Sequence, residues 1–234
     1  MKTKILILSL IVLGIFIINP VQAEEEERNV ATFSEISFKV PGTLHLTQGD
    51  EQSVKIVAKV ETLEELITEV KGRKLTIRFP NTTMFKNFKP GKIDIYITVP
   101  EIDALALSGS GDIVSEELSS RILELTMSGS GDLLIKKLDT EKVTANISGS
   151  GDIEINEGGV ADEFNSTISG SGSIKAEGFE ATNVSVRISG SGNCYITSNG
   201  EVKARIAGSG NVNYKGNPSI DSSVVGSGRV KEIK

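Results

Sequence analysis

The feature that most constrains this chain is a Gly-Ser-Gly tripeptide that recurs seven times at nearly constant spacing. The first copy lies within Ser108-Gly109-Ser110-Gly111-Asp112, and successive copies are 18 to 21 residues apart. A period near 20 is typical of stacked repeat architectures, in which each unit buries its apolar face only against its neighbours. The first glycines of the seven copies are Gly109, Gly129, Gly149, Gly170, Gly190, Gly208 and Gly226.

Each repeat has the same order of parts around its glycines. Apolar and polar residues alternate before the glycines, as in residues 143–147, and again after them, as in residues 153–155. This period of two predicts two strands per repeat, each with one buried face. Glycine suits the corner between the strands because it adopts a positive φ without strain. We expect the core to be lined by Val143, Ala145, Ile147, Ile153, Val184, Val186, Ile188, Val202, Ala204 and Ile206.

A repeat of this length restricts the choice of fold. It is too short for a strand–helix–strand crossover, which needs about 30 residues. It fits one rung of a parallel β-helix, with successive rungs about 4.8 Å apart. A hairpin meander is the alternative, but it explains less well why the two strands always flank the glycines in the same order. We therefore predict an all-β fold, a right-handed parallel β-helix (solenoid) with rungs of about 20 residues over residues 101–234.

Residues 24–100 are rich in strand patterns but less regular. We expect them to form a β-strand region that is continuous with the solenoid and closes its end. The segment 63–70 is compatible with either a helical turn or a strand. The acidic run Glu24–Glu27 is expected to be frayed.

Residues 1–23 have the features of a secretory signal peptide. Lys2 and Lys4 precede an apolar run over residues 5–18, and Val21-Gln22-Ala23 ends in the small residues of a cleavage site. The apolar run is shorter than the ~20 residues of a comfortable membrane span, which favours a signal peptide over a membrane anchor. After removal of the signal peptide we expect no transmembrane span. The mature protein is expected in the periplasm or outside the cell, including the cell surface.

Charge and single-residue chemistry exclude several function classes. Without the leader the chain has 23 basic and 31 acidic residues, a net charge of −8, and no basic cluster. Nucleic acid is therefore not expected as a partner. The single cysteine, Cys194, cannot form an intramolecular disulfide and takes an inward position of its rung. His45 lies in an alternating strand and faces outward, with no nucleophile indicated beside it.

The stretch Pro100–Gly111 carries a more specific resemblance. A strand, a Val-Pro step, an acidic residue, a short apolar strand and the first Ser-Gly-Ser-Gly together resemble the head GIN domain family, and residues 33–36 and 46–50 resemble that family's opening. The resemblance covers roughly residues 28–230. It implies an exported bacterial protein with a β-helical, adhesin-like head domain. Because the sequence ends soon after the last repeat, we expect no C-terminal barrel for self-transport.

Three aspartates at equivalent repeat positions, Asp112, Asp132 and Asp152, are candidates for a metal site. In a stack they would form a ladder about 4.8 Å apart, where a bound Ca²⁺ would relieve their repulsion. The alternative is that each carboxylate accepts an Asx-type hydrogen bond within its own solvated turn. Later repeats carry Ser, Asn and Arg there, which favours the turn role. We expect no cofactor and only weak Ca²⁺ binding.

These observations favour a non-catalytic, exported scaffold of the cell envelope, adhesin-like, that recognises an extended surface partner such as a polysaccharide or an envelope protein. Met84, Phe85 and Phe88 are candidate partner contacts, although they would also serve to cap the core. The alternatives are a polysaccharide-cleaving β-helix enzyme and a purely structural envelope protein. The turns between repeats are too short to wall a cleft, so we predict no enzyme activity. The oligomeric state is left open.

Overall fold

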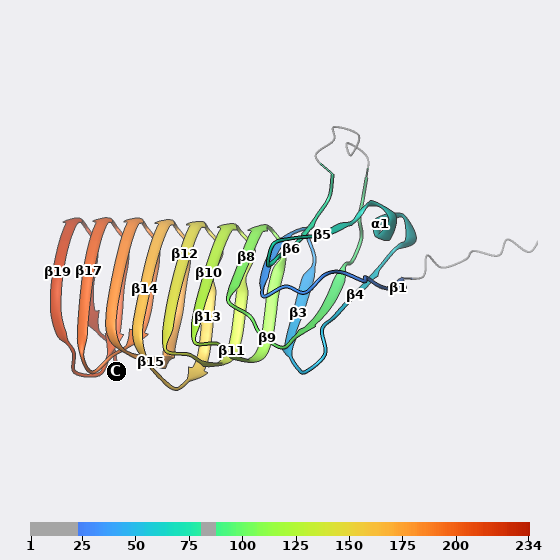
Figure 1. The fold of residues 1–234 in the computed structure, drawn as a ribbon. Coiled ribbons are helices and arrows are strands. Elements are labelled where there is room, and N and C mark those ends of the chain that lie inside the picture. Colours follow the sequence, from blue (N-terminus) through green and yellow to red (C-terminus); the bar gives the residue numbers. More distant parts are fainter. Residues whose placement is uncertain (1–22, 81–87) are drawn as a thin grey trace, which may run out of the picture.

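The structure is a computed structural model that describes residues 23–80 and 88–234. Figure 1 shows a row of stacked coils that ends, on one side, at the C-terminus, and on the other at a group of N-terminal strands and a short helix. Each coil of the repeat region consists of a strand, a glycine corner, a second strand and a turn. Neighbouring coils pair in parallel, and Gly129 lies opposite Gly149. The predicted fold class, an all-β parallel solenoid with rungs of about 20 residues, is confirmed.

The strands that precede the corners form one side of the solenoid, here called face A. They pair in register, so that residues at the same repeat position lie side by side. In spatial order face A consists of β6 (Lys74–Arg78), β2 (Glu35–Lys39), β8 (Ala104–Gly109), β10 (Ile122–Gly129), β12 (Lys142–Gly149), β14 (Val160–Gly170), the second half of β15 (Ser173–Gly190), β17 (Glu201–Gly208) and β19 (Ser219–Gly226).

The strands that follow the corners form the opposite side, face B. These strands are also parallel, and β15 belongs to both faces because its pairing continues through the turn between them. In spatial order face B consists of β7 (Asp94–Val99), β3 (Thr43–Gln48), β9 (Asp112–Ser119), β11 (Leu133–Asp139), β13 (Ile153–Gly158), the first half of β15, β16 (Asn193–Thr197), β18 (Asn211–Lys215) and β20 (Arg229–Glu232).

The core lies between the two faces and is built from the alternating apolar residues. All ten residues predicted to line it are buried, the most exposed being Ile206 at 3%. Parallel strands in register place like residues above one another, so rows such as Leu107, Met127 and Ile147 run along the solenoid axis. Buried residues from the N-terminal strands and from the repeats form one cluster.

The N-terminal strands enter this stack out of sequence order. β2 and β3 form a coil that lies between β6 and β8 on face A and between β7 and β9 on face B. The chain therefore builds this coil first, continues outward to β6 and β7, and then passes back over the coil through residues 100–103 to begin β8. Backbone hydrogen bonds hold this return, with Asp103 N–H donating to Ser34 O over 2.7 Å.

Antiparallel strands and a helix close the N-terminal end. β4 (Ser53–Ala58) pairs with β7, β1 (Glu24–Glu27) pairs with β4, and β5 (Ile67–Lys71) pairs with β6, all antiparallel. The expectation that the acidic run is frayed is wrong, because β1 is hydrogen-bonded along its length to β4. The segment 63–70, which the sequence left open between a helical turn and a strand, contains parts of both. Helix α1 (Val60–Glu65) ends just before strand β5 begins.

The C-terminal end has no comparable cover in the described part of the chain. Every residue of β19 is exposed, and Ile220 and Val224, which continue inward rows, are 39% and 38% exposed. β20 is exposed apart from Val230, which is partly buried. The last coil therefore covers the core of the coil before it while its own edge meets solvent.

Among residues 23–80 and 88–234, no helix is long and apolar enough to cross a membrane.

Candidate functional site

The Gly-Ser-Gly corners are stacked tightly on one another. Gly149 has a φ of 141°, and the carbonyl of Gly129 accepts both the Ser150 N–H (2.8 Å) and the Gly151 N–H (3.2 Å) from the next rung. A Cβ built on Gly151 would lie 2.0 Å from Gly131 O. The corners thus serve the stacking of rungs, and their backbone leaves no space between rungs for a ligand.

The aspartate ladder links neighbouring rungs. Asp112 Oδ1 accepts the backbone N–H of Asp132 (2.9 Å), and Asp132 Oδ1 accepts that of Asp152 (3.0 Å). Asp152 in turn accepts the Ser173 N–H (2.8 Å), and its Oδ2 pairs with Lys175 Nζ (2.7 Å). Each of these hydrogen bonds joins an aspartate to the next rung. The sequence had suggested bonds within the aspartate's own turn, and it did not indicate this link between rungs. An asparagine offers the same acceptor, and Asn193 Oδ1 accepts the N–H of the equivalent residue one rung on.

No cluster of three or more His, Cys, Asp or Glu side chains in residues 23–80 and 88–234 is arranged to hold a metal ion. The hydrogen bonds of the ladder occupy one carboxylate oxygen of each aspartate. Weak Ca²⁺ binding by the second oxygens stays a prediction.

The aromatic candidates lie only partly within the described chain. Met84 and Phe85 fall outside it. Phe88 lies inside, and its ring meets that of Phe79 edge to face, with ring centroids 5.5 Å apart. Phe79 itself packs against the core. The contact of Phe88 is compatible with a capping role, and a partner contact at these residues stays a prediction.

The two residues with reactive side-chain types have ordinary surroundings. His45 stacks on Tyr96 of the neighbouring strand at 4.8 Å, and its Nε2 lies 3.6 Å from Asp94 Oδ1. Cys194 is fully buried in an inward row, and burial raises the pKa of its thiol to about 12. At neutral pH the thiolate, which is the nucleophilic form, is therefore almost unpopulated.

A hollow on face A lies over β6, β2, β8 and β10, and we call it the alanine recess. Its volume is about 550 Å³, within the range of small-ligand sites. Its floor includes the outward residues of β8, Ala104 and Ala106. On the next strand, the same two rows carry Glu124 and Thr126. The recess exists because two small side chains stand where β10 carries longer polar ones.

Charged side chains surround the alanine recess in equal numbers of each sign. On one wall Lys74 Nζ pairs with Glu35 Oε2 (3.2 Å), and at the rim Arg73 pairs with Asp103. Arg73 also donates to Ser34 Oγ.

The opposite wall of the recess is different. Arg121 and Glu124 line it and are both exposed. Within the part of the chain that the structure describes, neither side chain makes a hydrogen bond or ion pair. These two groups are therefore available to a ligand, while the charged groups on the other wall are paired with one another.

Sequence reasoning missed this recess. A usable signal was present in residues 104–107, where alanine alternates with leucine and takes the outward positions that are polar in the later repeats. The alternation was interpreted only as a strand, and the small size of its outward residues was not considered. The four lining strands come from separate stretches of the chain, and the order in which they stack is set by the inserted N-terminal coil.

Comparison with known proteins agrees with this architecture. A family model described as "Putative auto-transporter adhesin, head GIN domain" matches residues 32–218. No curated protein matches the chain.

Solved structures share the fold over most of their length. A "putative adhesin" from Bacteroides fragilis is 25% identical with a TM-score of 0.84, and a "Putative lipid binding protein" from Parabacteroides distasonis is 26% identical with a TM-score of 0.73. A further "putative adhesin" from Parabacteroides merdae is 22% identical with a TM-score of 0.71 and shows the shared fold. Each comparison covers 91% of this chain and 97% of the other. Because the family model spans most of the sequence, the chain belongs to the head GIN domain family.

Proposed function

We propose that the protein is an exported, non-catalytic binding scaffold of the cell envelope that recognises an extended surface partner. The observation that carries this proposal is the alanine recess, a hollow of ligand size with two unpaired charged side chains, Arg121 and Glu124, on an otherwise regular face. Membership of an adhesin-like family supports a binding role at the cell surface or in the periplasm. The leader-like residues 1–23 support export.

The short connections between strands support a binding role over catalysis. β9 and β10 are joined by residues 120–121, and β11 and β12 by residues 140–141. Enzymes that cut polysaccharides need catalytic groups held against the scissile bond in a site that orients the substrate, and most glycoside hydrolases use two flanking carboxylates. Turns of two residues do not wall such a site. A polysaccharide-cleaving enzyme is therefore the less favoured alternative, and a purely structural envelope protein is the other.

A glycan array combined with a product assay tests the proposal. The mature protein, residues 24–234, is applied to the array and to envelope fractions from the producing cells, and soluble products are analysed by mass spectrometry. Saturable binding without cleavage is the expected result. Release of shorter saccharides would establish the enzyme instead, and the absence of binding to array, envelope fractions and lipid vesicles would leave the structural role. The vesicles are included because one structural relative is described as lipid-binding.

A further inference from the structure

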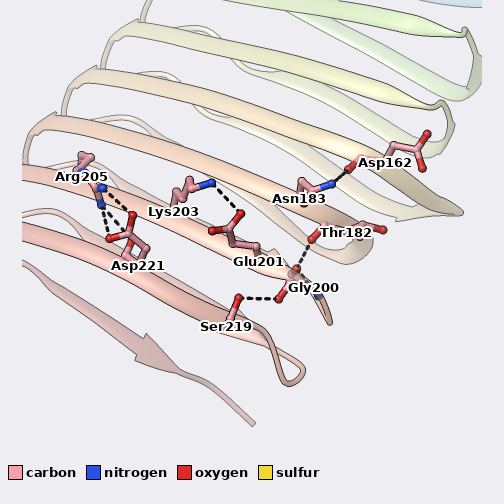
Figure 2. Close-up of polar contacts among 10 residues, drawn as sticks. Asp162, Thr182, Asn183, Gly200, Glu201, Lys203, Arg205, Ser219 and Asp221 are labelled. Carbon is pink, nitrogen blue, oxygen red and sulfur yellow. Dashed lines mark hydrogen bonds and ion pairs between the residues drawn. The ribbon is translucent and has the colours of Figure 1, made fainter.

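Three further hollows lie with the alanine recess along the turn edge of face A. A hollow of about 360 Å³ lies beside it and shares Arg73 with it, and another of about 280 Å³ shares Arg121. A fourth, of about 300 Å³, begins at Glu163, directly after Asp162 of the third. Asn183 in the fourth hollow donates to Asp162 O over 3.2 Å, as Figure 2 shows. We call the four together the turn-edge track.

The track follows the solenoid axis. Its lining residues come, in spatial order, from β6, β2, β8, β10, the turn before β12, β14, β15 and β17. Seven steps of about 4.8 Å give a length of about 34 Å. Three of the hollows are linked by shared arginines, and the fourth follows the third along the chain. A surface of this length fits a linear polymer better than a single small molecule.

The charges of the track exclude an anionic polymer. Its lining holds nine acidic and four basic residues, with the shared arginines counted once. Several acids are already paired: Glu163 with Lys142 (2.6 Å) and Glu201 with Lys203 (2.8 Å; Figure 2). The hydrogen bond from Lys142 holds the pKa of Glu163 below its usual range, so this carboxylate stays charged. The track as a whole is net negative, with the excess greatest at Asp139, Glu141 and Asp162, so a nucleic acid or an acidic polysaccharide would meet net repulsion there.

The backbone of face A excludes a peptide that binds by strand addition. Each strand under the track, from β2 to β17, pairs with a neighbour on both sides, so its backbone groups are already used. A partner must therefore bind through side chains. Uncharged hydrogen-bonding side chains recur along the track, including Thr126, Asn165, Asn183 and Ser185. Hydroxyl groups can both donate to carboxylates and accept from amides and guanidinium groups.

We propose that the turn-edge track binds an uncharged polysaccharide chain laid along the solenoid axis, with the alanine recess holding one sugar unit over Ala104 and Ala106. This inference rests on the proposed binding function and names its partner class and its site. The floor of Ala104 and Ala106 leaves room for a ring, and the exposed Arg121 and Glu124 provide a donor and an acceptor for its hydroxyls.

The test measures the affinity of the mature protein for neutral glucans and galactomannans of increasing length by calorimetry. Affinity is expected to rise with chain length until the polymer spans the track. Ala106→Gln, which fills the recess, is expected to weaken binding about tenfold, and Asn183→Ala, at the far end, about fivefold. Thr47→Gln places the same side chain on an exposed position of face B and is the matched control, with unchanged affinity expected. Circular dichroism confirms that each variant is folded.

The outcomes separate this inference from the proposed function. If neutral polysaccharides bind but both track variants retain wild-type affinity, the track is not the site although the scaffold binds glycans. Preferential binding of polylysine or of an acidic polysaccharide would overturn the partner class while leaving a binding scaffold. If the protein binds envelope fractions and no soluble polysaccharide, the inference fails and the proposed function stands. If it binds neither, both fail.

Discussion

At the scale of single residues, the second glycine of each corner is required by the distance between rungs. Gly151 has no positive φ, yet its Cβ would overlap Gly131 O at 2.0 Å and Met127 Sδ at 2.6 Å. Gly149, the first glycine, adopts a φ of 141°, which L-residues rarely reach. Sequence reasoning identified the conformational reason for glycine and could not detect the steric one, because it depends on the neighbouring rung.

Substitution Gly151→Ala is expected to lower the free energy of unfolding by about 2–4 kcal/mol, since backbone and not a flexible side chain blocks the Cβ. The measurement is denaturant unfolding followed by circular dichroism. Gly159→Ala is the control, because its Cβ would lie 3.6 Å from the nearest neighbouring atom, Asp139 Oδ1. Equal stability of the two variants would contradict the steric argument.

The aspartate ladder makes a second prediction at this scale. Asp132→Asn keeps an oxygen that accepts the Asp152 N–H and is expected to be close to wild type in stability. Asp132→Ala removes the acceptor and is expected to lose about 1–2 kcal/mol. Calorimetry with Ca²⁺ completes the comparison, with a dissociation constant no tighter than about 10⁻⁴ M expected for the wild type. Tight binding that Asp132→Asn abolishes would show instead that the ladder is a metal site.

At the scale of strands, the sequence predicted which segments pair but not the order in which they stack. The period of two and the constant spacing defined the repeat strands and their buried faces, and the ten core residues are where they were expected. The coil of β2 and β3 lies between later strands, and its apolar rows align with those of both β6 and β8. Local patterns carry no information on that choice. The alanine recess follows from it, which is why the site was missed.

The two ends of the stack are expected to differ in local stability. Among the described residues β19 pairs only with β17, whereas β12 pairs with β10 and β14. Amide hydrogen exchange followed by mass spectrometry is therefore expected to be at least about tenfold faster in peptides from residues 219–232 than in peptides from 142–149. The closed N-terminal end provides an internal reference, since β7 is paired with both β3 and β4. Equal protection of 219–232 and 142–149 would mean that another group covers the last coil in solution.

At the scale of the whole molecule, the solenoid behaves as a linear array in which each coil contacts mainly its neighbours. Its core is continuous from the N-terminal strands to the last coil, so binding at one position of the track need not change the others. The affinity for an extended partner can therefore be the combined result of many weak contacts on successive coils. Binding to such a partner requires that the mature protein reaches the compartment in which the partner occurs.

Export is therefore the last prediction. Cleavage after Ala23 is expected because Val21 and Ala23 are small residues that follow an apolar run with a basic start. Intact-mass measurement of the exported protein should give a chain that begins at Glu24, clearly lighter than the 24.9 kDa of the full sequence. Ala23→Arg, which puts a large charged side chain at the cleavage site, is expected to leave the full-length chain in the membrane fraction. A full-length wild-type chain in that fraction would contradict the proposed export, and with it the placement of the track outside the cytoplasm.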